Sequence, residues 1–215
     1  MADYRFENIN VSFGTDVIYK NFSIEFEKNR ITTILGRSGC GKTTLLNYIM
    51  KDILRYKNLS CVFQEEILVK WLTVYENIEL VLKNKGMSKT EKDEIIIKNL
   101  RLVNLNGYEK YYPSSLSCGM KQRVNIARAA SYPADLLFMD EPFKSIDIIN
   151  KEEIIGKLKQ EIKSRNQTAV MVSHDLDEAI DFSDNIICIS SKEGKKIKKF
   201  SVNKYISKEM LIKYI

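Results

Sequence analysis

A glycine-rich run is the first group of residues whose types and spacing could do chemistry. It fits the pattern G-x-x-x-x-G-K-[ST] and comprises Gly36, Arg37, Ser38, Gly39, Cys40, Gly41, Lys42, Thr43 and Thr44. Glycines free the backbone to wrap a phosphate, so that successive N–H groups point inward. A helix after the run would direct its positive end at the same anion, while Lys42 would add charge and the Thr43 hydroxyl would complete a Mg²⁺ shell. The run therefore predicts a phosphate-binding loop.

Two acidic residues at the end of an apolar run form the second group. The run Leu136–Met139 is followed directly by Asp140 and Glu141. A buried strand that ends in carboxylates presents them at its C-terminal edge, where ligands bind in open α/β sheets. Asp140 suits the support of Mg²⁺, and Glu141 suits the polarisation or deprotonation of a water molecule.

A third segment reads LSCGMKQR from residue 116 and is followed by the helical pattern VNIARAA. Ser117 and Gly119 lie where that helix should begin. A small polar residue and a glycine at a helix start indicate either an anion site or an N-cap formed by Ser117. The segment lies 23 residues before Asp140, which favours the first interpretation.

The elements that must position these residues alternate along the chain. The predicted strands are Ile31–Leu35, Leu59–Phe63, Leu136–Met139, Ala169–Ser173 and Ile186–Ile189, and the predicted helices include Glu91–Val103 and Asn150–Ser164. Strands that alternate with helices favour a parallel α/β sheet. Residues 4–27 alternate like antiparallel strands, and about 66–130 is mostly helical without a clear core strand. We therefore expect one domain, 1–215, with an α/β core of about 1–65 and 131–200 and a helical insertion between them.

Charge and composition exclude several classes of protein. The chain has 215 residues and a net charge of +6, but residues 192–215 hold eight Lys against two Glu, so the other 191 residues are neutral. A nucleic-acid-binding body is therefore not expected, and the basic tail is either a solvated face or lies near anionic lipid head groups. Within the tail we expect a strand at Lys195–Phe200 and a short amphipathic helix at Ser207–Ile215 with Met210, Leu211 and Tyr214 inward. No apolar run approaches the 20 residues of a membrane span, and no secretory signal is expected at the N-terminus. The four cysteines form no CxxC pair, which indicates reduced thiols rather than zinc.

The ordered motifs resemble those of the nucleotide-binding subunit of ATP-binding cassette (ABC) transporters. LSCGM is similar to that family's LSGGQ signature, Gln64 to its Q-loop glutamine, Asp147 to its D-loop aspartate and His174, the only histidine, to its switch histidine. The resemblance covers about residues 4–200. It implies a P-loop NTPase (RecA-like) core with an N-terminal antiparallel β subdomain and an inserted α-helical subdomain.

The resemblance also implies a mechanism of ATP hydrolysis in a homodimer. Two subunits would enclose two ATP molecules, each between the phosphate-binding loop of one subunit and the signature segment of the other: Ser117, Cys118, Gly119 and Met120. Gln64, Asp140 and Thr43 would support Mg²⁺. Glu141 would orient or activate the attacking water, and His174 would contact the γ-phosphate. Phe13 is the expected adenine platform, with Tyr4 and Tyr19 as weaker candidates and a core role for Phe13 as the alternative.

Three departures from the family pattern stand out. Cys118 replaces the first signature glycine, Met120 replaces the glutamine, and Lys144 lies before the D-loop, where small residues are usual. Cys118 adds a Cβ close to where a phosphate must approach. We therefore expect a functional but weakened ATP-bound dimer. The interval between Lys42 and Gln64 is also shorter than is usual in the family, which indicates that a peripheral part of the surface is missing.

The run QEEILVKWLTVYENIEL resembles the region after the Q-loop in importers of nitrate, sulfonate, taurine and related nutrients. The resemblance implies membrane-spanning permease subunits as partners, a solute-binding protein through the complex, and a peripheral place on the cytoplasmic face of the membrane. Leu68, Val69 and Trp71 would suit docking to the permease, with core packing as the alternative. Two other functions stay open: a soluble ABC-type ATPase outside transport, and a nucleotide-sensing module with weak turnover.

Overall fold

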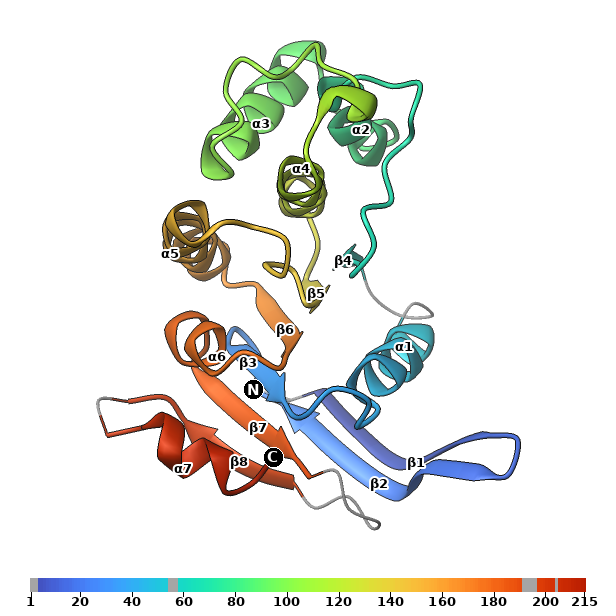
Figure 1. Cartoon of the computed structure of the whole chain (residues 1–215). Helices are drawn as coiled ribbons and strands as arrows, with labels where there is room; N and C mark the ends of the chain where they lie inside the picture. The colour runs from blue at the N-terminus through green and yellow to red at the C-terminus, as the bar shows by residue number, and fades with distance from the viewer. Residues whose placement is uncertain (1–3, 54–57, 191–196, 204) are drawn as a thin grey trace. The chain divides into compact units, whose positions relative to one another are not determined.

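The computed structural model of the chain describes residues 4–53, 58–190, 197–203 and 205–215 (Figure 1). The side chain of Phe13 also lies outside the description. Contacts divide the chain into two units. Unit 1 is Met1–Lys57 with Ile162–Ile215, and unit 2 is Asn58–Glu161.

Unit 1 begins with an antiparallel hairpin of β1 (Tyr4–Phe13) and β2 (Asp16–Phe26). Gly14 lies in the turn with φ +58°, a backbone conformation that glycine adopts without steric cost. Exposed and buried residues alternate along much of β2, because one face of the hairpin is covered and the other meets solvent. The predicted antiparallel opening segment is thus confirmed.

The sheet of unit 1 has the strand order β6-β3-β7-β8. Its strands are β3 (Ile31–Leu35), β6 (Thr168–Ser173), β7 (Asn185–Ile189) and β8 (Ile197–Ser201). β3 runs parallel to both neighbours, and β8 is antiparallel to β7. All residues of the three parallel strands are buried, as expected for strands covered on both faces.

Three helices lie wholly in unit 1: α1 (Lys42–Ile53), α6 (Leu176–Phe182) and α7 (Lys208–Ile212). In Figure 1, α1 and α6 lie on either side of β3. Leu211 of α7 is buried in a cluster with Leu35 and Cys188. The predicted inward orientation of Met210 and Tyr214 is wrong, since they are 43% and 42% exposed. Tyr214 lies beyond the end of α7, and its ring meets Phe200 edge-on.

The predicted tail elements agree in part with the structure. The strand expected at Lys195–Phe200 appears as β8, and its first two predicted residues lie outside the described part of the chain. The helix expected at Ser207–Ile215 is shorter, with Ser207 as its N-cap through a bond from the Met210 N–H to its hydroxyl.

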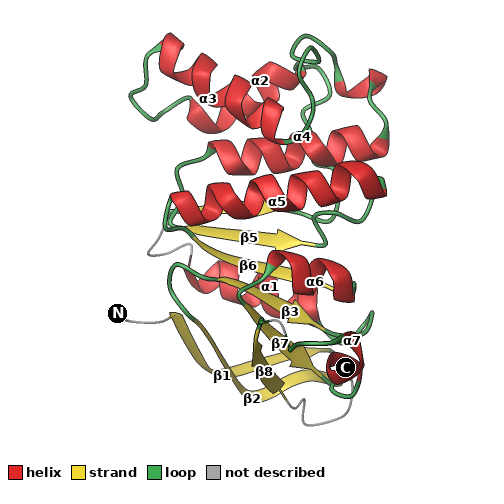
Figure 2. Cartoon of the chain, turned by 90° about the vertical axis from the view of Figure 1, so that its left-hand side faces the viewer, coloured by secondary structure: helices red, strands yellow, loops and turns green. Residues whose placement is uncertain are grey.

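Unit 2 pairs β4 (Leu59–Val62) in parallel with β5 (Leu136–Asp140). Its helices are α2 (Val74–Glu79), α3 (Lys89–Leu102), α4 (Cys118–Ser131) and α5 (Ile148–Ser164). The last residues of α5 belong to unit 1. Short 3-10 turns lie at Leu80–Leu82 and Pro113–Ser115. α4 packs against α2 and α3 (Figure 2). The Ser60 hydroxyl donates to Ala129 O at 2.8 Å and joins β4 to α4.

The helix starts in unit 2 are encoded locally. Thr73 and Ser88 each form a capping box with the glutamate three residues later, and Ser117 caps α4. The strands and helices predicted within residues 31–189 are confirmed to within two residues, and no strand occurs among residues 66–130. No helix within the described residues combines the length and apolar character needed to cross a bilayer.

Candidate functional site

The glycine-rich run forms the connection between β3 and α1 in unit 1. Gly39 and Gly41 have φ of +77° and +95°, a region that side chains strongly disfavour. A Cβ at Gly36 would lie 2.8 Å from the Cys40 sulfur and 2.9 Å from the Ile189 carbonyl oxygen, so the backbone passes too close for any side chain. The path of the loop therefore depends on all three glycines.

Lys42 is the first residue of α1, and its side chain folds back to bind carbonyl groups of the glycine-rich loop. Its side chain is only 5% exposed, and its ammonium group donates to Gly36 O at 2.8 Å and Arg37 O at 3.0 Å. Around this buried charge, Arg37, Ser38, Gly39 and Thr43 are exposed, Gly41 and Thr44 are half-buried, and Gly36 and Cys40 are buried. A cation at a helix N-terminus within a glycine-rich turn fits a polyphosphate.

His174 follows β6 at the same sheet edge as the glycine-rich run. β3 and β6 are parallel, and Leu35 is paired with Ser173, so Gly36 and His174 follow neighbouring strand ends. The Ser173 hydroxyl donates to Glu178 Oε2 at 2.9 Å and accepts from the Asp175 N–H at 3.0 Å. Asp175 in turn caps α6. These bonds fix the turn that carries the exposed His174 side chain.

Asp140 and Glu141 lie at the end of β5 in unit 2, as the sequence predicts. Asp140 is buried, and Glu141 is half-buried with φ +46°. A left-handed backbone at a non-glycine residue is a strained conformation of the kind found at functional sites. The Lys144 ammonium lies 3.7 Å from Glu141 Oε2. Gln64 is exposed beyond the end of β4, and β4 is parallel to β5, so Gln64 and the two acids share one edge.

The signature segment packs against the turn that follows Glu141. Ser117 accepts from the Met120 N–H at 3.2 Å, so both the N-cap and the helix start are present. A Cβ at Gly119 would lie 2.6 Å from Ser145 O. Ser117 and Cys118 are exposed, whereas Met120 is half-buried. Ser117 and Cys118 are therefore accessible to solvent, whereas Gly119 packs closely against Ser145 of the same chain.

Asp147 is held by Asn150 at the start of α5. The Asn150 N–H donates to Asp147 Oδ1 at 3.1 Å, and its amide nitrogen lies 3.1 and 2.9 Å from the two carboxylate oxygens. These bonds, the backbone bond first, lower the pKa of Asp147 below its ordinary value. The aspartate therefore stays ionised and fixes the D-loop turn.

The three candidates for a ring that stacks on adenine differ in how far they are buried. Tyr19 is 2% exposed and donates its hydroxyl to Gly41 O at 3.1 Å, so its suggested role as a stacking platform is wrong. The Tyr4 ring is half-buried with the Lys28 ammonium 5.7 Å from its centroid. The Phe13 side chain lies outside the described part of the structure, so its role stays a prediction.

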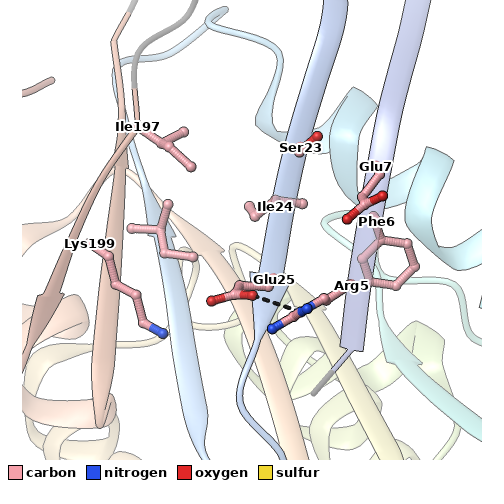
Figure 3. A pocket seen from close by; sticks show the side chains of 9 residues that line it. Arg5, Phe6, Glu7, Ser23, Ile24, Glu25, Ile197 and Lys199 are labelled. Carbon is pink, nitrogen blue, oxygen red and sulfur yellow. Dashed lines mark hydrogen bonds and ion pairs between the residues drawn. The ribbon is translucent and has the colours of Figure 1, made fainter. Parts of the chain in front are cut away.

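A separate hollow in unit 1 contains none of the predicted residues (Figure 3). It has a volume of about 490 Å³, and its walls include Phe6, Ile24 and Ile197. Two of its charged side chains have partners, since Arg5 pairs with Glu25 at 3.1 Å and Lys199 pairs with Glu27 at 2.7 Å. The hollow offers no arrangement of groups that resembles a catalytic site.

The family model described as ABC transporter matches residues 19–144, more than half of the chain. The chain belongs to the ABC transporter family. The match begins at the residue that contacts the glycine-rich run and ends beyond the β5 carboxylates, so it covers most of the geometry above.

Curated relatives of this cassette include importer subunits. The chain is 38% identical over 205 residues to a spermidine/putrescine import ATP-binding protein of Acetivibrio thermocellus, with 87% of this chain and 58% of that protein covered. It is 36% identical over 199 residues to an aliphatic sulfonates import ATP-binding protein of Bacillus cereus, with 85% of this chain and 77% of that protein covered. The cassette thus spans little more than half of the first relative's length.

Solved structures share the fold. An ATP-binding cassette in a dimeric post-hydrolysis state bound to ADP and phosphate has a TM-score of 0.79 and 26% identity, covering 94% of this chain and 99% of that one. A metal-chelate type ABC transporter in an inward-facing conformation has a TM-score of 0.76 and 21% identity, with coverage of 100% and 89%. The predicted α/β fold of a P-loop NTPase with an antiparallel β subdomain is confirmed.

Two buried polar residues, Asn77 and Glu178, were not predicted from the sequence. The Asn77 side chain accepts from the Val69 N–H at 2.8 Å and donates to the carbonyls of Val69, Leu72 and Thr73, which fixes the loop around Trp71. Glu178, buried behind Ser173, is the other. An asparagine within an amphipathic helix face was the available signal for the first, but nothing in its spacing names the loop that it binds.

Proposed function

We propose that this ABC cassette hydrolyses ATP as the energy-coupling subunit of a membrane importer. The single observation that carries the proposal is the closed, lysine-centred glycine-rich loop of unit 1, with His174 at the neighbouring strand end. Membership of the ABC family and the importer names of the relatives support the coupling to transport.

The glycine-rich run would bind the ATP phosphates through its backbone N–H groups and Lys42, with Phe13 against the adenine. Binding moves the Lys42 ammonium from the loop carbonyls toward the β- and γ-phosphates. Phosphoryl transfer needs positioning and charge stabilisation more than covalent chemistry, so a rigid loop with a buried cation is well suited to it.

The residues available for Mg²⁺ are Thr43, Gln64 and Asp140. They offer a hydroxyl, an amide oxygen and a carboxylate, the hard oxygen donors that Mg²⁺ prefers. No cluster of three or more His, Cys, Asp or Glu side chains suited to a metal occurs among the described residues. That fits Mg²⁺, which is usually held by one or two carboxylates together with substrate phosphates. When bound, Mg²⁺ would neutralise charge on the phosphates.

Glu141 would orient the attacking water and accept its proton, and His174 would donate a hydrogen bond to the γ-phosphate. The left-handed backbone at Glu141 supports this assignment, because strain is retained where the surrounding structure specifies one side-chain direction. The turn held by Ser173 and Glu178 supports the role of His174 in the same way.

Ser117, Cys118, Gly119 and Met120 would close on the nucleotide of a second copy, with Asp147 beside them. Exposure of Ser117 and Cys118 and the dimeric state of the solved cassettes support a homodimer. Nucleotide would then hold two copies together, and its hydrolysis would release them. The altered signature supports a second candidate, a nucleotide-sensing module with weak turnover.

The surface around Trp71 would contact permease subunits. Trp71 is 79% exposed on a loop fixed by Asn77, while Leu68 lines a hollow of about 430 Å³ with Lys70 and Lys121. Of the three predicted docking residues, Trp71 is exposed, and Leu68 and Val69 are half-buried. A permease partner implies a peripheral place on the cytoplasmic face of the membrane, and a solute-binding protein would act through the same complex.

Substitution Glu141→Gln separates binding from turnover. The amide keeps the shape of the side chain but cannot take a proton, so we expect a loss of ATPase rate of about 100-fold or more with nucleotide-dependent dimers retained. Phosphate release and sedimentation velocity with ATP measure the two effects. Glu152→Gln, on the exposed surface of α5, is the control. A wild-type protein without ATPase activity, alone or with its permease, would contradict the enzyme assignment and leave the sensing module.

A further inference from the structure

A buried tyrosine of the antiparallel hairpin reaches the glycine-rich loop. Tyr19 lies in the middle of β2, and its hydroxyl donates to Gly41 O at 3.1 Å. Its ring packs against Phe22 with a centroid distance of 4.7 Å and an interplanar angle of 56°. Burial, with a contribution from Cys40, raises the pKa of Tyr19 above its ordinary value. The hydroxyl therefore keeps its proton and acts as a donor.

The acceptor is a peptide whose orientation decides the chemistry of the loop. Gly41 O also accepts the first bond of α1, from the Leu45 N–H at 2.9 Å. Because a trans peptide is planar, its carbonyl and N–H point in opposite directions. Fixing Gly41 C=O toward the helix and Tyr19 therefore aims the Lys42 N–H the other way, out of the N-terminus of α1 where an anion would bind.

Gly41 has an unusual need for such a restraint. Its φ of +95° is one of several conformations that glycine adopts at little cost, so the residue alone does not specify a single peptide orientation. The helix supplies one bond to the carbonyl and Tyr19 supplies a second from a different element. A peptide held from two directions has fewer alternative orientations than one held by the helix alone.

We infer that Tyr19 is a positioning residue for nucleotide binding, whose hydroxyl holds the Gly41–Lys42 peptide in the orientation that binds phosphate. The inference rests on the proposed function and adds a role that the loop motif does not contain. Its alternative is that Tyr19 only fills space beneath the loop. Tyr19→Phe distinguishes the two, because it keeps the ring against Phe22 and removes only the hydroxyl.

For Tyr19→Phe we expect a KM for ATP raised about five-fold, as for the loss of one buried hydrogen bond, with kcat within two-fold of the wild type. Titration with a fluorescent ATP analogue should show the same loss in affinity. Amide hydrogen exchange without nucleotide should become faster at Leu45 of α1, whose N–H donates to Gly41 O. Tyr48→Phe, on the exposed side of the same helix, should leave all three values unchanged.

Two outcomes would overturn the inference: an unchanged KM and Leu45 exchange rate in Tyr19→Phe, or a fall in kcat and melting temperature with KM unchanged. The exchange measurement needs no ATPase activity. Comparison of Leu45 with the buried amides of β3 in the same sample distinguishes a local change from a loss of global stability. Lys42→Ala separates this inference from the proposed function. If Lys42→Ala loses nucleotide binding while Tyr19→Phe keeps it, only the role of Tyr19 fails, and if Lys42→Ala binds normally the proposed function fails.

Discussion

The glycine-rich run and the signature segment are both turns that contain glycine and lead into a helix, yet they differ in which of their residues are buried. In the first, the key charge is turned inward, since Lys42 is 5% exposed and its ammonium is bound to loop carbonyls. In the second, Ser117 and Cys118 face outward, and the buried contact is made by Gly119 against Ser145.

The difference shows what each segment needs in order to act. The glycine-rich run carries its own cation, its own helix and a restraint from Tyr19, so it can bind phosphate within one chain. In the signature segment the Ser117 oxygen caps its own helix, and the four residues 117–120 carry no charged side chain. A segment of that kind is suited to complete a site supplied by another chain.

Among the substitutions that test this difference, Lys42→Ala should have the largest effect, which is on the affinity for ATP. Removal of the buried cation takes away the charge that the phosphates meet and leaves two loop carbonyls without their donor. We expect affinity for ATP to fall by about 100-fold or more, in the range of a lost charge-assisted group. A fluorescent ATP analogue measures the affinity, and Lys51→Ala, exposed on the same helix, is the control. Normal binding would mean that the loop does not act alone.

Gly119→Ala tests whether the signature glycine is required by its own chain. The new Cβ would lie 2.6 Å from Ser145 O, so backbone must shift, and we expect a loss of about 2 kcal/mol in the free energy of unfolding without nucleotide. Gly156→Ala is the matched control, because that glycine lies within α5 with open space around it and alanine should stabilise the helix by about 0.5–1 kcal/mol. Urea unfolding measures both.

Equal stability of Gly119→Ala and the wild type would remove the contact with Ser145 as a reason for the glycine. The close approach to a second copy's nucleotide would then be the remaining explanation. Gly119 would then have no role within its own chain, unlike the three glycines of the glycine-rich run and unlike Ser117, which caps α4.

Sequence patterns predict what is local and fail where a contact is distant. The glycine-rich run, the strand before Asp140 and the Ser117 cap were readable because a few neighbouring residues specify each of them. The bond from Tyr19 to Gly41 joins residues 22 positions apart, and a tyrosine in an amphipathic strand is equally compatible with an adenine platform. Only the fold shows that Tyr19 points into the molecule.

Distant contacts also explain why the prediction for the C-terminal tail was partly wrong. The apolar residues of 207–215 predicted a helix with three inward side chains, but only Leu211 is buried. Helical periodicity gives the directions of side chains relative to one another, whereas the length of the helix and the position of Phe200 decide which of them are covered. The basic charge there is partly neutralised by pairs such as Lys208 with Asp177, at 2.6 Å.

Cys118→Gly should have the smallest effect and bears most directly on the outward face of the signature segment. If the exposed Cβ obstructs the approach of a second copy's phosphate, its removal should tighten ATP-dependent dimerisation by about five-fold, or roughly 1 kcal/mol of relieved crowding. Sedimentation in a Glu141→Gln background measures the dimer without turnover. Cys118→Ser retains the Cβ and should behave like the wild type, so tightening in both variants would point to the sulfur rather than to crowding. An unchanged dimer affinity in Cys118→Gly would mean that the signature segment accommodates the Cys118 side chain. The two turns would then differ only in which of their residues are exposed to solvent.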